Sequence, residues 1–200
     1  MESDMDSVIR AEAMAYLTQT LGDGAAGITV AAIDRTGAGP RVRWDIPRLS
    51  RPRVGAGGAP ERAHVAELVS RMIALRWQGS QQPREVPAES YLDLHRDFSG
   101  VFTDTLETPA GWHFMLAAAA ESILEAGVPA GSRTCQVKSK FGTLRWYVRG
   151  STPQGMLETI AAAEWLSGAV CEVCGAPGTT RPGGWIRTLC DAHADAKRRR

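Results

Sequence analysis

The feature that most constrains this chain is a set of four potential metal ligands near its carboxyl end. Two pairs, Cys171/Cys174 and Cys190/His193, each leave two residues between the ligands, and fifteen residues separate Cys174 from Cys190. This spacing is typical of two knuckles that face each other across one zinc ion. We therefore predict one structural Zn²⁺ per chain, in a zinc-ribbon-like module over residues 171–200 that chelation should loosen more than the rest.

Composition and charge limit the possible partners. The chain has 200 residues and is 44% hydrophobic, which is enough to bury a core. Its 23 basic and 22 acidic residues give a net charge of +1, so no overall field attracts nucleic acid or a membrane. A nucleic acid or an acidic protein surface would need a local basic patch, such as the carboxyl terminus, where residues 171–200 carry six basic residues against three acidic ones.

The amino terminus and the cysteines indicate a reducing, cytoplasmic location. The first residues are acidic rather than basic, unlike a secretory signal, and the longest apolar run, from Phe114 to Ala120, is too short to span a bilayer. A site that takes three cysteines leaves Cys135 as an unpaired thiol. An unpaired thiol fits a reducing compartment better than a secreted location. Because no apolar run is long enough to span a bilayer, we expect no association with a membrane.

Residues 1–88 are predicted to form an amino-terminal unit with its own helices and hairpin. Apolar periodicity, turn residues and β-branched residues define its elements. These are a helix over 7–21, strands over 28–34 and 41–46, a basic Gly/Pro-rich loop over 47–60 and a helix over 60–77.

Residues 89–170 are predicted to form a core of helices and a β-hairpin. The helical stretches are 90–105, 108–127 and 152–167, and the hairpin covers Thr134–Arg149. Together with the amino-terminal unit this pattern indicates an α+β fold, in which small antiparallel β-hairpins pack with amphipathic helices.

One stretch allows a catalytic alternative. Asp93, His95 and Asp97 alternate, and on a strand they would share one face as an acid/base or metal cluster. On a helix they diverge, and the apolar positions around them follow the helical period, with Ser90 and Asp93 as a capping box. We favour the helix, and an enzyme acting on a phosphorylated or nucleic-acid substrate stays an alternative.

The predicted hairpin has one apolar face. A two-residue type II′ turn at Gly142-Thr143 would pair Phe141 with Leu144 and Lys140 with Arg145. In this register Cys135 lies on the apolar face as a packing residue.

The other face of the hairpin is basic and is our candidate binding surface. It comprises Lys138, Lys140, Arg145, Tyr147 and Arg149. Like charges placed opposite each other destabilise a sheet, so something should compensate them. The compensation is either an internal carboxylate of the following helix, at position 158 or 164, or an anionic partner.

Several motifs together resemble a family of uncharacterised small proteins of bacteria and their phages. The motifs are Gly111-Trp112, the hairpin QVKSKFGTLRWY from Gln136 to Tyr147, CEVCG from Cys171, and GWIRTLCDAH from Gly184 to His193. The resemblance covers residues 91–193 and implies no activity.

The sequence favours a zinc-binding, non-catalytic recognition protein. A metal with four protein ligands has no open position at which to activate water. The basic hairpin face and the basic carboxyl terminus would then contact nucleic acid or a protein partner. A phage- or defence-related regulator acting by protein contact is a further alternative, suggested by the resemblance.

Overall fold

The computed structural model describes residues 3–48 and 60–198, and it confirms the α+β class. The helices are α1 (Asp4–Leu21), α2 (Arg62–Arg76), α3 (Ser90–Asp97), α4 (His113–Ala126), α5 (Gln154–Leu166) and α6 (Asp191–Arg198), with short 3-10 turns η1 (Gly22–Ala25), η2 (Ala110–Trp112) and η3 (Ser167–Ala169). The strands are β1 (Thr29–Thr36), β2 (Gly39–Asp45), β3 (Leu106–Glu107), β4 (Arg133–Lys140), β5 (Thr143–Arg149), β6 (Thr179–Arg181) and β7 (Arg187–Leu189).

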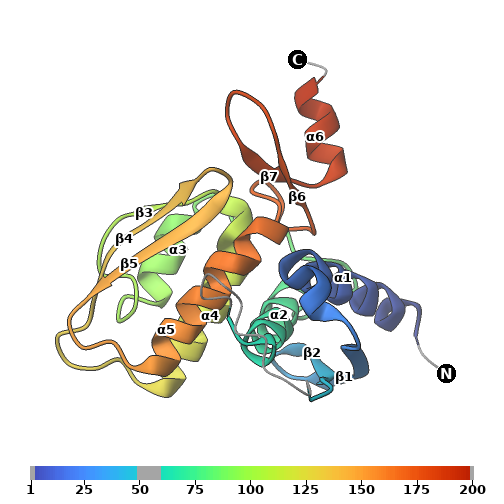
Figure 1. Ribbon diagram of the computed structural model, residues 1–200, viewed down its shortest axis with the longest axis horizontal. Helices are drawn as coiled ribbons and strands as arrows, with labels where there is room; N and C mark the ends of the chain where they lie inside the picture. Colours follow the sequence, from blue (N-terminus) through green and yellow to red (C-terminus); the bar gives the residue numbers. More distant parts are fainter. Residues whose placement is uncertain (1–2, 49–59, 199–200) are drawn as a thin grey trace.

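The helices α2, α4 and α5 form the centre of the molecule, with a β-sheet on either side (Figure 1). The hairpin β1–β2 packs on α2, and the sheet β3–β4–β5 packs against α5. One continuous hydrophobic core extends from Ile9 to Val170, so residues on both sides of the predicted boundary at residue 88 contribute to it. A second, small cluster contains Cys171, Leu189 and Ala194 and lies beside β7 and α6. We call the antiparallel pair β6–β7 the carboxyl-terminal hairpin.

Local sequence explains where α1 begins and ends. The Ser3 side chain accepts a hydrogen bond from the Asp6 amide (3.1 Å), and acidic residues in the first turn suit the positive end of the helix dipole. Gly22 ends the helix with a φ of 53°, which a residue with a side chain adopts only at a cost. The helix buries Tyr16 and Leu17 completely.

The hairpin β4–β5 forms as predicted, but in a different register. Its turn consists of Phe141 and Gly142, both with positive φ (54° and 75°), as in a type I′ turn. Lys140 therefore pairs with Thr143, and Lys138, rather than Lys140, lies opposite Arg145. The predicted turn at Gly142-Thr143 was wrong: the two central residues are Phe141 and Gly142, one position earlier in the chain, with Gly142 in the second central position that type I′ turns favour for glycine.

Two side chains that were predicted to be buried are exposed or only half-buried, for different reasons. Phe141 occupies the turn and is 66% exposed. Cys135 lies at the point where the register shifts between Thr134 and Gln136, so it is a bulge residue and is only half-buried. Thr134 takes the inward position in its place and is buried.

The tip of this hairpin rests on the carboxyl-terminal hairpin. The Thr188 hydroxyl donates a hydrogen bond to the Gly142 carbonyl (2.7 Å). A Cβ atom at Gly142 would lie 3.0 Å from the carbonyl carbon of Arg187 and 3.1 Å from the amide nitrogen of Thr188. The two motifs that are adjacent here, around Gly142 and around Thr188, lie more than forty residues apart in the chain.

Two further features complete the fold. The strand β3, which the sequence did not predict, runs parallel to β4, with Leu106 beside Val137. Most of the predicted basic loop, residues 49–59, and the last two arginines lie outside the described residues. Within residues 3–48 and 60–198, no helix is long and apolar enough to cross a membrane.

A pair of glycine substitutions tests the docking of the hairpin tip. Gly79 and Gly142 have similar φ values (65° and 75°), but a Cβ atom at Gly79 meets nothing within 4 Å. We expect Gly79→Ala to lose roughly 1 kcal/mol of unfolding free energy from backbone strain alone. Gly142→Ala should lose about 1–3 kcal/mol more, because the methyl group overlaps β7. Equal losses in urea unfolding would show that the two hairpins do not pack as described.

Candidate metal centre

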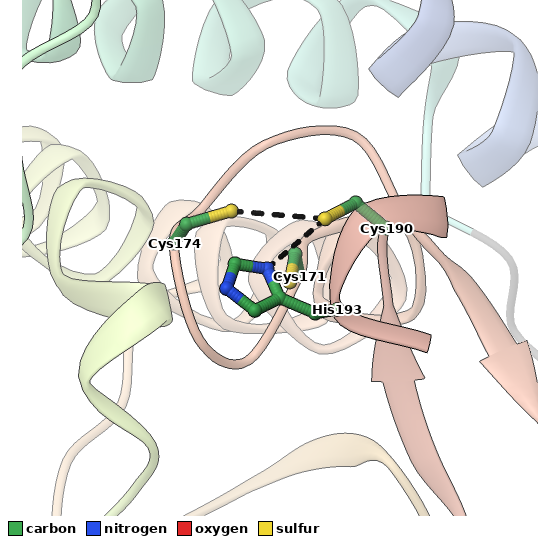
Figure 2. A group of neighbouring side chains, drawn as sticks. All are labelled: Cys171, Cys174, Cys190 and His193. Carbon is green, nitrogen blue, oxygen red and sulfur yellow. Dashed lines mark hydrogen bonds between the residues drawn. The ribbon is translucent and has the colours of Figure 1, made fainter. Parts of the chain in front are cut away.

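The four predicted ligands converge on one point (Figure 2). Their ligand atoms all lie within 4.8 Å of one another. The Sγ atoms of Cys174 and Cys190 are 3.9 Å apart, and the Nδ1 atom of His193 lies 3.6 Å from Cys171 Sγ and 3.1 Å from Cys190 Sγ. A tetrahedral zinc site has edges of ~3.8 Å between sulfurs and ~3.6 Å between sulfur and nitrogen, as its bond lengths require. The cluster therefore has dimensions that can hold one metal ion.

Tight backbone turns position each pair. In the first knuckle the Gly175 amide donates to the Cys171 carbonyl (2.9 Å), and the Cys171 amide donates to the Ala176 carbonyl (2.8 Å). Gly175 adopts a φ of 73°, which lets the chain reverse directly behind the ligands. In the second knuckle β7 ends at Leu189, and Cys190 and His193 lie at the start of α6, one helical turn apart.

The electrostatics of the cluster favour a bound cation. Hydrogen bonds from the Cys174 thiol and from nearby backbone amides lower the pKa of Cys171 well below its ordinary value. The hydrogen bond to Cys171 in turn raises the pKa of Cys174, because a second thiolate beside the first is unfavourable. A divalent metal supplies the positive charge that allows all three sulfurs to ionise together.

The first knuckle is packed tightly against the body of the protein. The Gly111 amide donates to the Glu172 carbonyl (3.0 Å), and the indole of Trp112 donates to the Val170 carbonyl (3.1 Å). A Cβ atom at Gly111 would lie 2.1 Å from the Cys171 carbonyl oxygen, which no side chain permits. Gly111 is therefore the residue at which η2 and the knuckle approach each other backbone to backbone.

A buried polar network joins α1 and α2 behind this knuckle. One Glu12 carboxylate oxygen accepts hydrogen bonds from Arg76 Nε (2.6 Å) and from the Tyr16 hydroxyl (2.9 Å). The other oxygen accepts a hydrogen bond from the Trp77 indole (2.9 Å). The Glu12 and Arg76 side chains are only 9% and 6% exposed, so this is an ion pair inside the protein. Burial and the Glu12 carboxylate raise the pKa of Tyr16 well above its ordinary value.

Two members of the network also hold the knuckle itself. Arg76 Nη1 donates to the Cys174 carbonyl (2.8 Å), and the Tyr16 hydroxyl is hydrogen-bonded to the Gly175 carbonyl. These bonds link residues 98 and 159 positions apart in the chain. No local pattern in the sequence indicates them, since Arg76 and Tyr16 occur at ordinary positions of amphipathic helices. The body therefore fixes the backbone of the first ligand pair from behind.

A second ion pair orders the chain on the other side of the ligands. The buried Glu172 accepts hydrogen bonds from Arg187 Nε (2.6 Å) and from the Thr188 amide (3.2 Å). The Glu172 amide donates to the Thr188 carbonyl (2.9 Å). An ion pair and hydrogen bonds thus link the two knuckles directly, in addition to the convergence of their ligand atoms.

The predicted binding residues are gathered on one face of the hairpin. Side chains alternate along β4 and β5, and Val137, Leu144 and Trp146 are buried. The positions between them therefore point away from the core. They carry the predicted set, which we call the basic face: Lys138, Lys140, Arg145, Tyr147 and Arg149.

The residues of the catalytic alternative do not form a cluster. Asp93, His95 and Asp97 lie on α3, as the favoured prediction held, and both carboxylates pair with Arg96. The helix ends at Asp97 instead of near residue 105, and the predicted capping box does not form, because Glu89 is the N-cap and Ser90 is already the first helical residue. The Ser90 hydroxyl is hydrogen-bonded to the imidazole of His113 in α4 (3.0 Å). Among the described residues, the cysteine–histidine group is the only potential metal cluster.

Comparison with known proteins gives no family assignment. No family model, no curated protein and no solved structure matches this chain significantly. The resemblance suggested by the motifs therefore stays a prediction, of which the structure supports only the carboxyl-terminal Cys/His cluster.

Elemental analysis tests the ligand assignment. We expect one zinc ion per chain in the wild-type protein and little or none in Cys174→Ser, since three ligands bind zinc much more weakly than four. Cys135→Ser is the matched control, because Cys135 lies outside the cluster in β4, and it should keep its zinc. A metal content that is unchanged in Cys174→Ser would contradict the assignment.

Arg76→Met tests whether the body supports the centre. The substitution leaves the Glu12 carboxylate buried without its cation, so we expect a loss of roughly 3–5 kcal/mol in unfolding free energy. Zinc should also pass more readily to a competing chelator, since the Cys174 carbonyl loses its donor. Arg71→Met in the same helix is the control: its partners Glu67 and Glu125 are exposed, and it should lose at most about 1 kcal/mol. Unchanged zinc retention in Arg76→Met would contradict a supporting role.

Proposed function

We propose that this protein is a zinc-binding, non-catalytic recognition protein in which the basic face of the β4–β5 hairpin binds an anionic partner. One zinc ion per chain, held by the two knuckles, has a structural role. Three thiolates and one imidazole occupy all four tetrahedral positions, so the metal offers no site for a substrate or for an activated water molecule. We therefore place recognition on the protein surface that the centre stabilises, rather than at the metal.

The charge of the basic face is the observation that carries this proposal. Four cations of the face point outward, and Arg133 lies beside Arg149 as a fifth. The neighbouring strand contributes one carboxylate, Glu107, which accepts a hydrogen bond from Gln136 (3.2 Å). None of the described carboxylates forms an ion pair with Lys138, Lys140, Arg145 or Arg149.

The two internal carboxylates that could have neutralised this face are engaged elsewhere. Glu164 accepts a hydrogen bond from the Trp146 amide (2.8 Å). Glu158 contacts the His64 imidazole (3.2 Å) and the Gln154 amide (2.9 Å). Neither one touches the basic face, so the explanation of an internal partner at these positions was wrong.

The other hairpin of the protein provides an internal comparison. On β2, Arg41 pairs with Glu67 (2.7 Å) and Arg43 pairs with Asp34 (3.6 Å). Both of these arginines thus have carboxylates beside them. On the basic face Lys138 lies across from Arg145 on one side and beside Glu107 on the other, but Glu107 is hydrogen-bonded to Gln136 and forms no ion pair with Lys138. An external anion would relieve the repulsion between Lys138 and Arg145.

Charge reversal separates a role in binding from a role in folding. In Lys138→Glu/Lys140→Glu, the change at residue 138 turns the repulsion with Arg145 into attraction, but it also places a carboxylate beside Glu107. Because these two effects oppose each other, we expect the unfolding free energy to change by no more than a few tenths of a kcal/mol. Binding to immobilised heparin, a generic polyanion, should weaken, so that the variant elutes at lower salt.

Arg41→Glu/Arg43→Glu is the matched control on the other hairpin, with the same change in net charge. Its elution should shift much less than that of the basic-face variant. If both double variants elute together, net charge alone governs retention and the proposal fails.

A further inference from the structure

Two lysine–aromatic pairs lie on the β4–β5 hairpin, one on the basic face and one where that face meets the turn. Lys138 Nζ lies 5.8 Å from the centre of the Tyr147 ring, and Lys140 Nζ lies 5.5 Å from the centre of the Phe141 ring. The chain contains twenty arginines and only three lysines, and two of those lysines are in these pairs. Each ring remains accessible, with Tyr147 47% and Phe141 66% exposed.

Phe141 is an unfavourable residue for the position that it occupies. It is the only non-glycine residue with positive φ in the described chain, where a type I′ turn prefers Asn, Asp or Gly. Its ring gains little from burial, because two thirds of it faces solvent. Backbone strain together with an exposed ring costs stability without any gain in packing, which is a pattern typical of functional positions.

The proposed function requires an anionic partner, and the two exposed rings favour one class of anion over the others. An acidic protein or a duplex could meet the positive charges, but neither offers flat unpaired bases to the rings. A single-stranded nucleic acid offers both, since phosphates can contact the cations while bases stack on the aromatic faces. Tyr147 pairs with Gln136, which lies five residues before Phe141, so the backbone positions of the two aromatic residues are roughly 17 Å apart along the strand. One strand of several nucleotides can therefore reach both rings.

We infer that the basic face binds single-stranded nucleic acid, with bases stacked on Tyr147 and Phe141 and phosphates held by Lys138, Lys140 and Arg145. This inference rests on the proposed function and deepens it. Binding is tolerant of sequence, because every base has a face that can stack, and it weakens as salt rises.

Fluorescence anisotropy with a labelled oligothymidine of about ten nucleotides tests the inference, with a duplex of the same length as the second probe. Tyr147→Leu and Phe141→Asn should each weaken binding to the single strand by about 5- to 100-fold, and change binding to the duplex little. Phe141→Asn should be at least as stable as the wild type, because Asn tolerates positive φ. Weaker binding by Phe141→Asn therefore cannot come from unfolding.

Tyr91→Leu is the control, since Tyr91 lies on α3 and is also 47% exposed. It should bind both probes as the wild type does. In Lys138→Glu/Lys140→Glu the plot of log affinity against log salt should become less steep by about 1.4, since each lost contact with a phosphate of a single strand removes about 0.7 from the magnitude of the slope.

The outcomes separate the inference from the proposed function. If Tyr147→Leu and Phe141→Asn bind oligothymidine as tightly as the wild type, or if polyaspartate is bound and oligothymidine is not, the inference is overturned and the anionic partner stands. If charge reversal leaves binding to oligothymidine, duplex and polyaspartate unchanged, or if the wild type binds none of them, both ideas fail.

Discussion

The hydrogen bond from Arg76 to the Cys174 carbonyl is the contact on which the arrangement of this protein depends. It belongs to a buried network with Glu12 and Tyr16 that ties α1 and α2 to the first ligand pair. The backbone of Gly111 packs directly against the backbone of the same knuckle, with no room for a side chain between them. The second ligand pair comes from β7 and α6, at the other end of the carboxyl-terminal hairpin. A metal ion shared by both pairs would therefore join that hairpin to the whole helical body.

The Cys/His cluster is also connected to the basic face of the β4–β5 hairpin. The strand β7 carries Thr188, which holds the Gly142 carbonyl at the tip of the β4–β5 hairpin. Lys140 and Phe141 lie directly before that glycine, so the knuckles fix the position of one end of the basic face. Under the proposed function, a structural metal at this cluster would help to hold the basic face in one conformation.

The sequence predicted that the Cys/His cluster would come together because its spacing is a local property. It predicted which residues share the basic face because alternation along a strand needs no tertiary information. It misplaced the hairpin register for a definite reason. Sliding one strand by two residues keeps every side chain on its own face, so the apolar pattern of Val137, Leu144 and Trp146 fits both registers equally well. Only the Phe141-Gly142 turn and the bulge at Cys135 distinguish them. Arg76 escaped prediction because its partner is 98 residues away.

Hydrogen–deuterium exchange with and without a chelator tests most directly whether the metal holds the body and the carboxyl-terminal hairpin together. On removal of zinc, amides of α1 and α2 around Tyr16 and Arg76 should lose protection together with those of β6, β7 and α6. The amide of Gly111, which is bonded to the Glu172 carbonyl, should follow them. If only residues after Cys174 lose protection while α1, α2 and Gly111 keep theirs, the knuckle is an independent module and this account is wrong.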